Sequence, residues 1–145
     1  MSLFEKLQAK SRETLDAEIQ RGRDFLETNK KRPEVKETAS GLQYEVLVEG
    51  TGAKPTSSNS RVTTHYTGTT IDGKVFDSSV NRGQPLSFGL NQVISGWTEG
   101  LQLMPVGSKY KFYIPHEMAY GERGAGGAIP GGAALIFEVE LLDTN

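Results

Sequence analysis

The stretch Ile94-Ser-Gly-Trp-Thr-Glu-Gly-Leu-Gln-Leu103 decides how the rest of this 145-residue sequence is organised. Ile94, Trp97, Leu101 and Met104 recur at helical spacing, which predicts one short amphipathic helix. Gly96 precedes the tryptophan, and a residue without Cβ lets the helix backbone approach whatever lies beside it. The segments on either side have the composition of strands rather than helices. We therefore expect this helix to pack on a sheet.

Strand patterns surround the predicted helix. Residues 42–48, 109–114 and 135–141 alternate apolar and polar side chains, and residues 61–70 are rich in Val, Thr, His and Tyr. Asp72-Gly73 is a strong hairpin signal. The pattern predicts a twisted antiparallel sheet of four to six strands with the short helix against its apolar face, which is an α+β fold.

The first 40 residues differ in composition from the rest of the chain. They hold half of the charged residues but only one of the 17 glycines. From Ser2 to about Lys31 the residue types favour helix, and Pro33 is expected to end it. We therefore predict two parts: a charged helical arm with its linker at residues 1–40, and a sheet domain at residues 41–145.

The apolar stripe of the arm is thin. Phe4 and Leu7 mark an early turn, and Leu15, Ile19 and Leu26 follow at helical spacing. A helix with so narrow an apolar face is marginal by itself. It should lie on the sheet domain or on a second copy of the chain. Two interpretations stay open: a solvated helix that leads into the domain, and an arm that forms a homodimer.

Composition excludes several functional classes. A formal net charge of −2 gives no electrostatic footprint for nucleic acid, and no apolar run is long enough for a membrane span. The absence of cysteine excludes disulfides and thiolate chemistry, and two distant histidines disfavour a metal site or a catalytic triad. No cofactor is expected. No apolar segment of a secretory signal follows Met1, so we expect a cytoplasmic protein, or a periplasmic one if a signal lies upstream.

Two local features bear on binding. The glycine-rich segment 121–132 lacks the Gly-Lys-Ser/Thr ending of a phosphate loop and precedes a strand, so we interpret it as a flap beside a binding site. Aromatic residues also gather near turns. Each alone is most simply a core residue, but together they could wall a pocket for an apolar, uncharged ligand such as proline. These residues are Tyr66, Phe76, Phe88, Trp97, Tyr120 and Phe137.

Several motifs occur in an order and spacing that resemble one family. They are Val62-Thr-Thr-His-Tyr-Thr-Gly68, Asp72-Gly-Lys-Val-Phe-Asp-Ser-Ser79, Val93-Ile-Ser-Gly-Trp-Thr-Glu-Gly100, Met104-Pro-Val-Gly107, Ala119-Tyr-Gly121, Ile129-Pro130 and Leu135-Ile-Phe-Glu-Val-Glu-Leu-Leu142. Residues 41–143 thus resemble the FKBP-type peptidyl-prolyl cis-trans isomerases. Phe25 to Lys30 and Ser40 to Tyr44 resemble the bacterial subgroup typified by the macrophage infectivity potentiator, in which a helical N-terminal region dimerises.

The resemblance implies a half-barrel sheet wrapped around the short helix, with the site between them. Trp97 would be the floor of the pocket, and the Ile94 N–H and Tyr120 hydroxyl would anchor substrate carbonyls. Asp77 would sit near the twisting amide, held by Tyr66 and Arg82. The implied catalytic residues are Tyr66, Phe76, Asp77, Trp97, Tyr120 and Phe137, and the implied substrate-binding residues are Arg82, Leu86, Val93, Ile94 and Ile129.

The implied activity is isomerisation of Xaa-Pro bonds in proline-containing polypeptides, with macrolides of the rapamycin type as inhibitors. Such a reaction needs no nucleophile, metal or cofactor, because only rotation about a partial double bond is required. Two residues depart from the family pattern. Leu86 stands where many members have an aromatic wall residue, and Ala125 stands where some have histidine. The alternative is a non-catalytic peptide-binding or chaperone module that uses the same groove.

Overall fold

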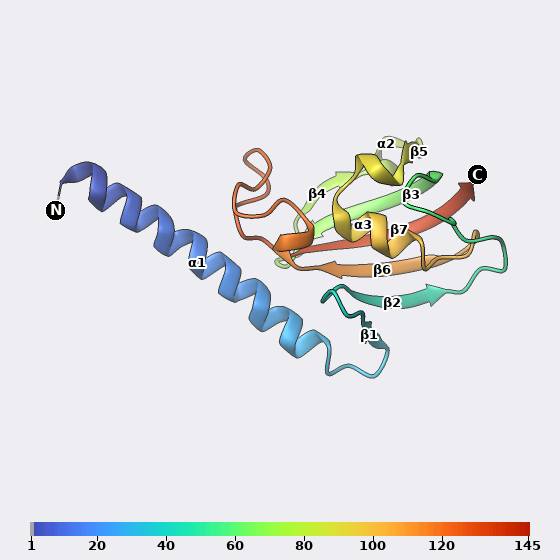
Figure 1. The fold of residues 1–145 in the computed structure, drawn as a ribbon, viewed down its shortest axis with the longest axis horizontal. Helices are drawn as coiled ribbons and strands as arrows, with labels where there is room; N and C mark the ends of the chain where they lie inside the picture. The colour runs from blue at the N-terminus through green and yellow to red at the C-terminus, as the bar shows by residue number, and fades with distance from the viewer. Residues whose placement is uncertain (1) are drawn as a thin grey trace.

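Seven strands form one antiparallel sheet in the computed structural model, which describes residues 2–145. Along the sheet the order is β1-β2-β6-β7-β3-β4, and β5 pairs with the first half of β3. Figure 1 shows the short helix α3 lying across this sheet, as the sequence predicts. The strands are β1 (Val35–Glu37), β2 (Gln43–Val48), β3 (Arg61–Thr70), β4 (Val75–Ser78), β5 (Leu86–Gly89), β6 (Lys109–Ile114) and β7 (Leu135–Thr144).

The number of strands exceeds the predicted four to six. The additional strands β1, β4 and β5 have only three or four residues each, too few for an alternating pattern to stand out. β1 also lies within the segment predicted as arm and linker, because Val35 to Glu37 pair with β2. The sheet therefore begins before residue 41, while the proposed domain boundary itself stays a prediction.

The centre of the sheet is the ladder between β3 and β7. It runs from the pair Val62–Thr144 to the pair Thr70–Leu135, and β7 also pairs along its length with β6. The hairpin predicted at Asp72-Gly73 is confirmed, since these residues turn the chain from β3 into β4. The residues Phe137, Val139 and Leu141 of this central strand alternate along one face of the sheet and are buried in the core with Trp97 and Leu101.

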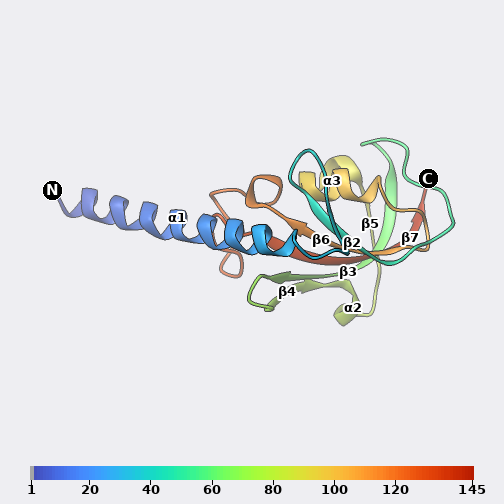
Figure 2. The same cartoon turned by 90° about the horizontal axis from the view of Figure 1, so that it is seen from below.

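Helix α3 (Ser95–Leu101) matches the predicted segment within two residues at each end. It buries Trp97 and Leu101, and Met104 follows it into the core. Figure 2 shows α3 on one side of the sheet, separate from the short helix α2 (Ser79–Arg82). Two short 3₁₀ helices, η1 (Leu90–Gln92) and η2 (His116–Met118), complete the domain.

Helix α1 (Leu3–Asn29) forms the arm, and it leaves the sheet at one end in both views (Figures 1 and 2). Its second half packs on the domain through the buried residues Ile19 and Gly22. The helix approaches the domain closely at Gly22, because a Cβ added there would lie only 3.1 Å from Ala134 Cβ. Its first half leaves Phe4 and Leu7 exposed, at 69% and 57%. The expected contact with the sheet domain thus exists, while the N-terminal turns that carry Phe4 and Leu7 remain exposed.

A buried amide pair joins the end of α1 to the sheet. Asn29 Nδ2 donates to Gln43 Oε1 at 2.9 Å, and Gln43 Nε2 donates to the Leu26 carbonyl at 2.9 Å. Both side chains are buried and thus depend on each other for hydrogen bonds. The alternating pattern of residues 42–48 does not indicate this link, since Gln43 is only one of its polar positions.

Within residues 2–145, no helix has both the length and the hydropathy to span a membrane. The same residues contain no group of three or more His, Cys, Asp or Glu side chains arranged to hold a metal ion.

Candidate functional site

A cavity of about 380 Å³ lies where α3 and η1 meet β4, β5 and β7. Its lining is mostly aromatic and aliphatic, and the only charged residue among the lining residues is Asp77. Such a lining favours an apolar, uncharged ligand. The lining residues are Phe76, Asp77, Leu86, Phe88, Gln92, Val93, Ile94, Trp97, Tyr120 and Phe137.

The structure brings together most of the residues that the sequence nominates. Three nominated residues, Tyr66, Arg82 and Ile129, do not line the cavity, although Tyr66 and Arg82 bind Asp77 and Ile129 packs in the core. Two lining residues were missed. Phe88 had been noted only as one of the aromatics near turns, and Gln92 carried no sequence signal. The catalytic and binding roles of all these residues stay predictions.

Trp97 lines the cavity and is 5% exposed. Its ring centroid is 5.1 Å from that of Tyr66 and 5.2 Å from that of Phe137, both nearly perpendicular, and 5.3 Å from that of Phe88. Edge-to-face packing of this kind holds an aromatic ring in one orientation. Among the described residues the Trp97 Nε1 group has no hydrogen-bond acceptor. The cavity therefore rests on a fixed aromatic surface.

Two glycines allow α3 to bring Trp97 this close to the sheet. A Cβ at Gly96 would lie 2.7 Å from Ile114 Cγ2, and a Cβ at Gly100 would lie 2.6 Å from Phe112 Cε1. Both distances are far below ordinary carbon contacts of about 3.5–4.0 Å. Gly96 and Gly100 thus form a smooth helix face against β6. The position of Trp97 relative to the sheet therefore depends on these two glycines.

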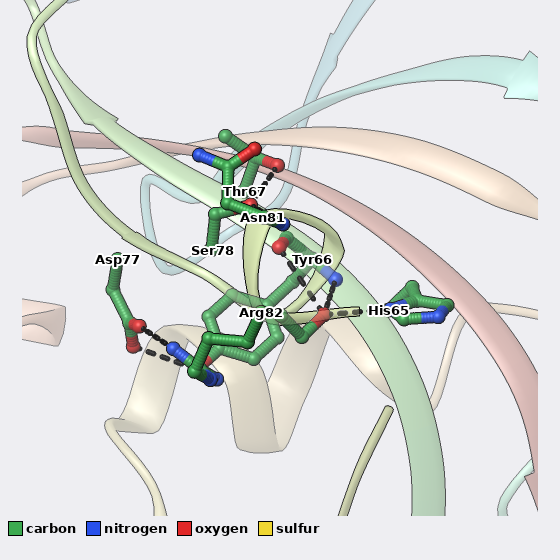
Figure 3. A network of polar contacts seen from close by, with 8 residues as sticks. His65, Tyr66, Thr67, Asp77, Ser78, Asn81 and Arg82 are labelled. Carbon is green, nitrogen blue, oxygen red and sulfur yellow. Dashed lines mark hydrogen bonds and ion pairs between the residues drawn. The ribbon is translucent and has the colours of Figure 1, made fainter. Parts of the chain in front are cut away.

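A polar network borders the cavity beside Asp77 (Figure 3). The Tyr66 hydroxyl donates to Asp77 Oδ2 at 2.6 Å, Arg82 forms an ion pair with the same carboxylate, and Arg82 Nη2 donates to the Tyr66 hydroxyl at 3.0 Å. Burial opposes the charge on Asp77, but the hydrogen bonds from Tyr66 and Arg82 outweigh it and lower the pKa of Asp77 below its ordinary value. Burial and the bond to Asp77 raise the pKa of Tyr66.

Ser79 fixes the strand position of Tyr66, and sequence reasoning missed it. The Tyr66 N–H donates to Ser79 Oγ at 2.7 Å, and His65 Nδ1 lies 2.9 Å from the same oxygen. β3 pairs with β5 before this point and with β4 after it, so the Ser79 side chain fills the gap between two strand partners. Ser79 is fully buried. It thereby sets where Tyr66 enters the network.

Residues 121–132 form a loop that precedes β7, as the flap interpretation predicts, and a strand rather than a helix follows it. Ala125 and Ile129 form an isolated bridge that folds the loop on itself. Tyr120, at its start, is 40% exposed and lines the cavity, whereas Ile129 is 6% exposed. Arg12 of α1 pairs with Glu122 on this loop at 3.3 Å. The arm therefore touches the segment next to the cavity.

An antiparallel sheet wrapped around one short helix, with an apolar cavity over a buried tryptophan, defines the class of FKBP-like folds. Comparison with known sequences agrees: residues 52–142 match the family described as FKBP-type peptidyl-prolyl cis-trans isomerase. Residues 1–46 match the domain amino-terminal to it. This chain therefore belongs to the FKBP-type peptidyl-prolyl cis-trans isomerase family, whose members bind proline-containing peptides and macrolides.

The chain is similar to several bacterial relatives. It is 52% identical over 141 residues to the FKBP-type 22 kDa peptidyl-prolyl cis-trans isomerase of Escherichia coli, a match covering 97% of this chain and 68% of the relative. It is 60% identical over 122 residues to FkpA of Aeromonas hydrophila, covering 84% and 45%. It is 48% identical over 125 residues to the outer membrane protein MIP of Legionella longbeachae, covering 86% and 53%. The resemblance to the macrophage infectivity potentiator subgroup is thus confirmed.

The solved structures agree with this assignment. The crystal structure of FkpA from Escherichia coli is 44% identical with a TM-score of 0.89, covering 95% of this chain and 64% of that one. A peptidyl-prolyl cis-trans isomerase from Pseudomonas syringae is 44% identical with a TM-score of 0.84, covering 90% and 95%. The chain spans about half the length of some curated relatives that it matches. The predicted fold class is confirmed by both structures.

Proposed function

We propose that this chain catalyses cis–trans isomerisation of Xaa-Pro peptide bonds in polypeptides and so assists their folding. The observation that carries the proposal is the apolar cavity over Trp97, bordered on one side by the bound carboxylate of Asp77. Its volume of about 380 Å³ is at the lower end of the range for small-ligand pockets. A proline ring with parts of its neighbours is a ligand of suitable size and polarity.

The chemistry needs only rotation about the C–N bond. Partial double-bond character sets a barrier of about 18–20 kcal/mol, so the uncatalysed reaction takes tens of seconds or longer. At the twisted transition state amide resonance is lost and the carbonyl becomes less polar. A water-poor apolar cavity disfavours the planar, well-solvated amide relative to this state. Every tenfold in rate requires about 1.4 kcal/mol of such preferential binding.

The residues divide this task. The Trp97 ring supports the proline, and Phe76 and Phe137, whose ring centroids are 5.5 Å apart and nearly perpendicular, hold it from the side. The Ile94 N–H and the Tyr120 hydroxyl bind carbonyls of the polypeptide on either side of the rotating bond. A proline ring held in this way stays fixed while the preceding carbonyl rotates about the C–N bond. The cavity thus orients the substrate as well as removing it from water.

Asp77 serves as a fixed negative charge beside the rotating amide. Its lowered pKa keeps it ionised throughout the physiological range, and Tyr66 and Arg82 hold its oxygens in place. As the carbonyl rotates, the direction of its dipole changes while the carboxylate stays where it is. Interactions of this preorganised kind require no rearrangement of the protein during the reaction.

The test is a peptide isomerisation assay with and without a macrolide such as rapamycin. We expect a short Xaa-Pro peptide to isomerise faster in the presence of the chain, and the macrolide to abolish the effect. Trp97→Ala should lose most of the acceleration, while Trp→Phe at the same position should retain part of it. Macrolide binding without acceleration would refute catalysis and favour the non-catalytic peptide-binding module.

We further propose that the exposed apolar turn of α1 forms a homodimer contact. Phe4 and Leu7 are more than half exposed and lie on one face with Leu15, along a groove of the same helix. Leu7→Glu should lower the mass measured by sedimentation equilibrium, whereas Ala9→Glu adds the same charge on another face and should not. A monomeric full-length chain at high concentration would refute this contact.

The expected cytoplasmic location stays a proposal, to be tested by cell fractionation.

A further inference from the structure

Gln92 lies at the rim of the cavity, and the oxygen of its side-chain amide already accepts a hydrogen bond from the protein. Gln92 Oε1 accepts a hydrogen bond from the Gly89 N–H at 2.9 Å. A backbone N–H can only donate, so the amide oxygen must face Gly89 and the NH₂ group must be the other branch. Among residues 2–145, no group accepts a hydrogen bond from Gln92 Nε2. The bond to Gly89 thus orients the side chain, and the NH₂ group of Gln92 can donate to a bound molecule.

A second donor lies two residues further along the same rim. Gln92, Val93 and Ile94 all line the cavity. The Ile94 N–H, just before the first turn of α3, has no acceptor in the described part of the chain. Consecutive Cα atoms are about 3.8 Å apart, and an extended peptide advances about 3.3 Å per residue. A polypeptide whose carbonyl meets Ile94 therefore brings a neighbouring residue within reach of Gln92.

The charges around the rim favour a particular kind of neighbour. Asp77, the only charged residue of the lining, is paired with Arg82 and hydrogen-bonded by Tyr66. Gln92 offers two N–H donors and, with its oxygen occupied, a weak acceptor. A carboxylate is the strongest acceptor that a polypeptide side chain can present to such a donor. A lysine or arginine at the same place would meet only the amide oxygen, which already accepts from the Gly89 N–H, and would be bound more weakly.

We propose that Gln92 selects polypeptide sequences by donating from Nε2 to an acidic side chain near the proline, within two residues of the carbonyl bound at Ile94. This inference rests on the proposed isomerase function and adds a substrate preference to it. Gln92 would be a specificity residue: it touches the substrate chain, but not the rotating bond.

The test uses short peptides that differ only at one residue. Glu, Lys or Leu is placed immediately before the proline, or at the first or second residue after it, and kcat/KM is measured for each. Gln92→Glu keeps an acceptor for the Gly89 N–H but replaces the donor with a negative charge. Asn91→Asp adds the same charge at a neighbouring exposed residue that does not line the cavity, and is the matched control.

For the wild-type chain we expect kcat/KM to favour Glu over Lys by about threefold to fivefold at one of the three positions. Gln92→Glu should reverse that preference at the same position, while Asn91→Asp should leave it in place. Equal changes in the two variants, or no change in either, would overturn the inference while leaving the proposed function standing. A wild-type chain that accelerates none of the peptides would instead overturn the proposed function.

Discussion

Replacing Gly96 with alanine tests how the cavity floor is positioned. The new Cβ would lie 2.7 Å from Ile114 Cγ2 and 2.9 Å from Ile114 Cδ1, and no other side chain contacts it as closely. Ile114 is fully buried, so it has little room to move. Either α3 retreats from β6 by roughly 1 Å to restore ordinary contacts, or Ile114 leaves its rotamer. Trp97, the next residue along α3, moves with the helix.

Two opposing terms set the size of the effect. Overpacking of this kind costs about 1–3 kcal/mol, while alanine in place of glycine favours helix by about 1 kcal/mol. The free energy of unfolding of Gly96→Ala should thus fall by about 0–2 kcal/mol. Ile114→Ala alone should cost about 2–5 kcal/mol but removes the three atoms nearest to the new methyl. In that background Gly96→Ala should stabilise the chain by about 1 kcal/mol.

A double-mutant cycle measured by urea unfolding decides the matter, with fluorescence of Trp97, the only tryptophan, as the probe. The sign of the Gly96→Ala effect should change between the two backgrounds, with a coupling energy of about 1–3 kcal/mol. Isomerase activity should fall in Gly96→Ala and recover partly in the double variant, because the helix returns toward the sheet. Additivity within about 0.5 kcal/mol would refute the close approach of Gly96 to Ile114.

Three further predictions follow from the site and the sheet. Because the pKa of Asp77 is lowered by folding, the stability that its ionised form contributes is present above its unfolded pKa of about 4 and is lost as the pH falls through the lower folded value. Asp77→Asn should remove this acid step from urea midpoints measured between about pH 2 and 6. Burial and the bond to Glu45 raise the pKa of Tyr113 to about 12, so its contribution to stability is complete below about pH 10 and is lost as the pH rises through the folded value. Absorbance at about 295 nm should show a late-titrating phenol that Tyr113→Phe removes. Leu86→Phe should tighten macrolide binding by about twofold to tenfold, measured by calorimetry, since it adds an aromatic wall to the cavity; unchanged affinity would mean that position 86 does not contact the ligand.

The parts of the fold that could be predicted are those with long, regular patterns. α3 and the long strands β6 and β7 show clear periodicity, and the Asp72-Gly73 turn has a sequence signal of its own. β4 and β5 are too short for a pattern, and they exist because β3 offers both of them a partner. Gln43 is a polar position of the alternating pattern, yet it is buried, and its side chain is bound by Asn29, which lies in another element. Pairings of this kind are set by tertiary structure and leave no trace in local sequence.

The candidate site divides in the same way. Trp97, Phe76 and Phe137 were nominated through motif resemblance, and the structure brings them to one cavity. Ser79 belongs to a quoted motif, but its role depends on a gap between two strands that only the sheet register reveals. Gln92 is an ordinary polar residue in sequence. What distinguishes it is the hydrogen bond from Gly89, which depends on the local backbone geometry of η1.

The central position of β7 has a consequence for how the chain is made. Ribosomes synthesise proteins from the N-terminus, so β3 and β6 are both made before β7, the strand that joins them. Until β7 is synthesised, β3 and β6 have no strand between them. The pairing of β3 with β7 joins segments that are far apart in sequence, and contacts of this kind form slowly. Phe137 arrives on the same strand. The last strand thus completes the sheet and one wall of the cavity in a single step, and a nascent chain that stops before it has neither.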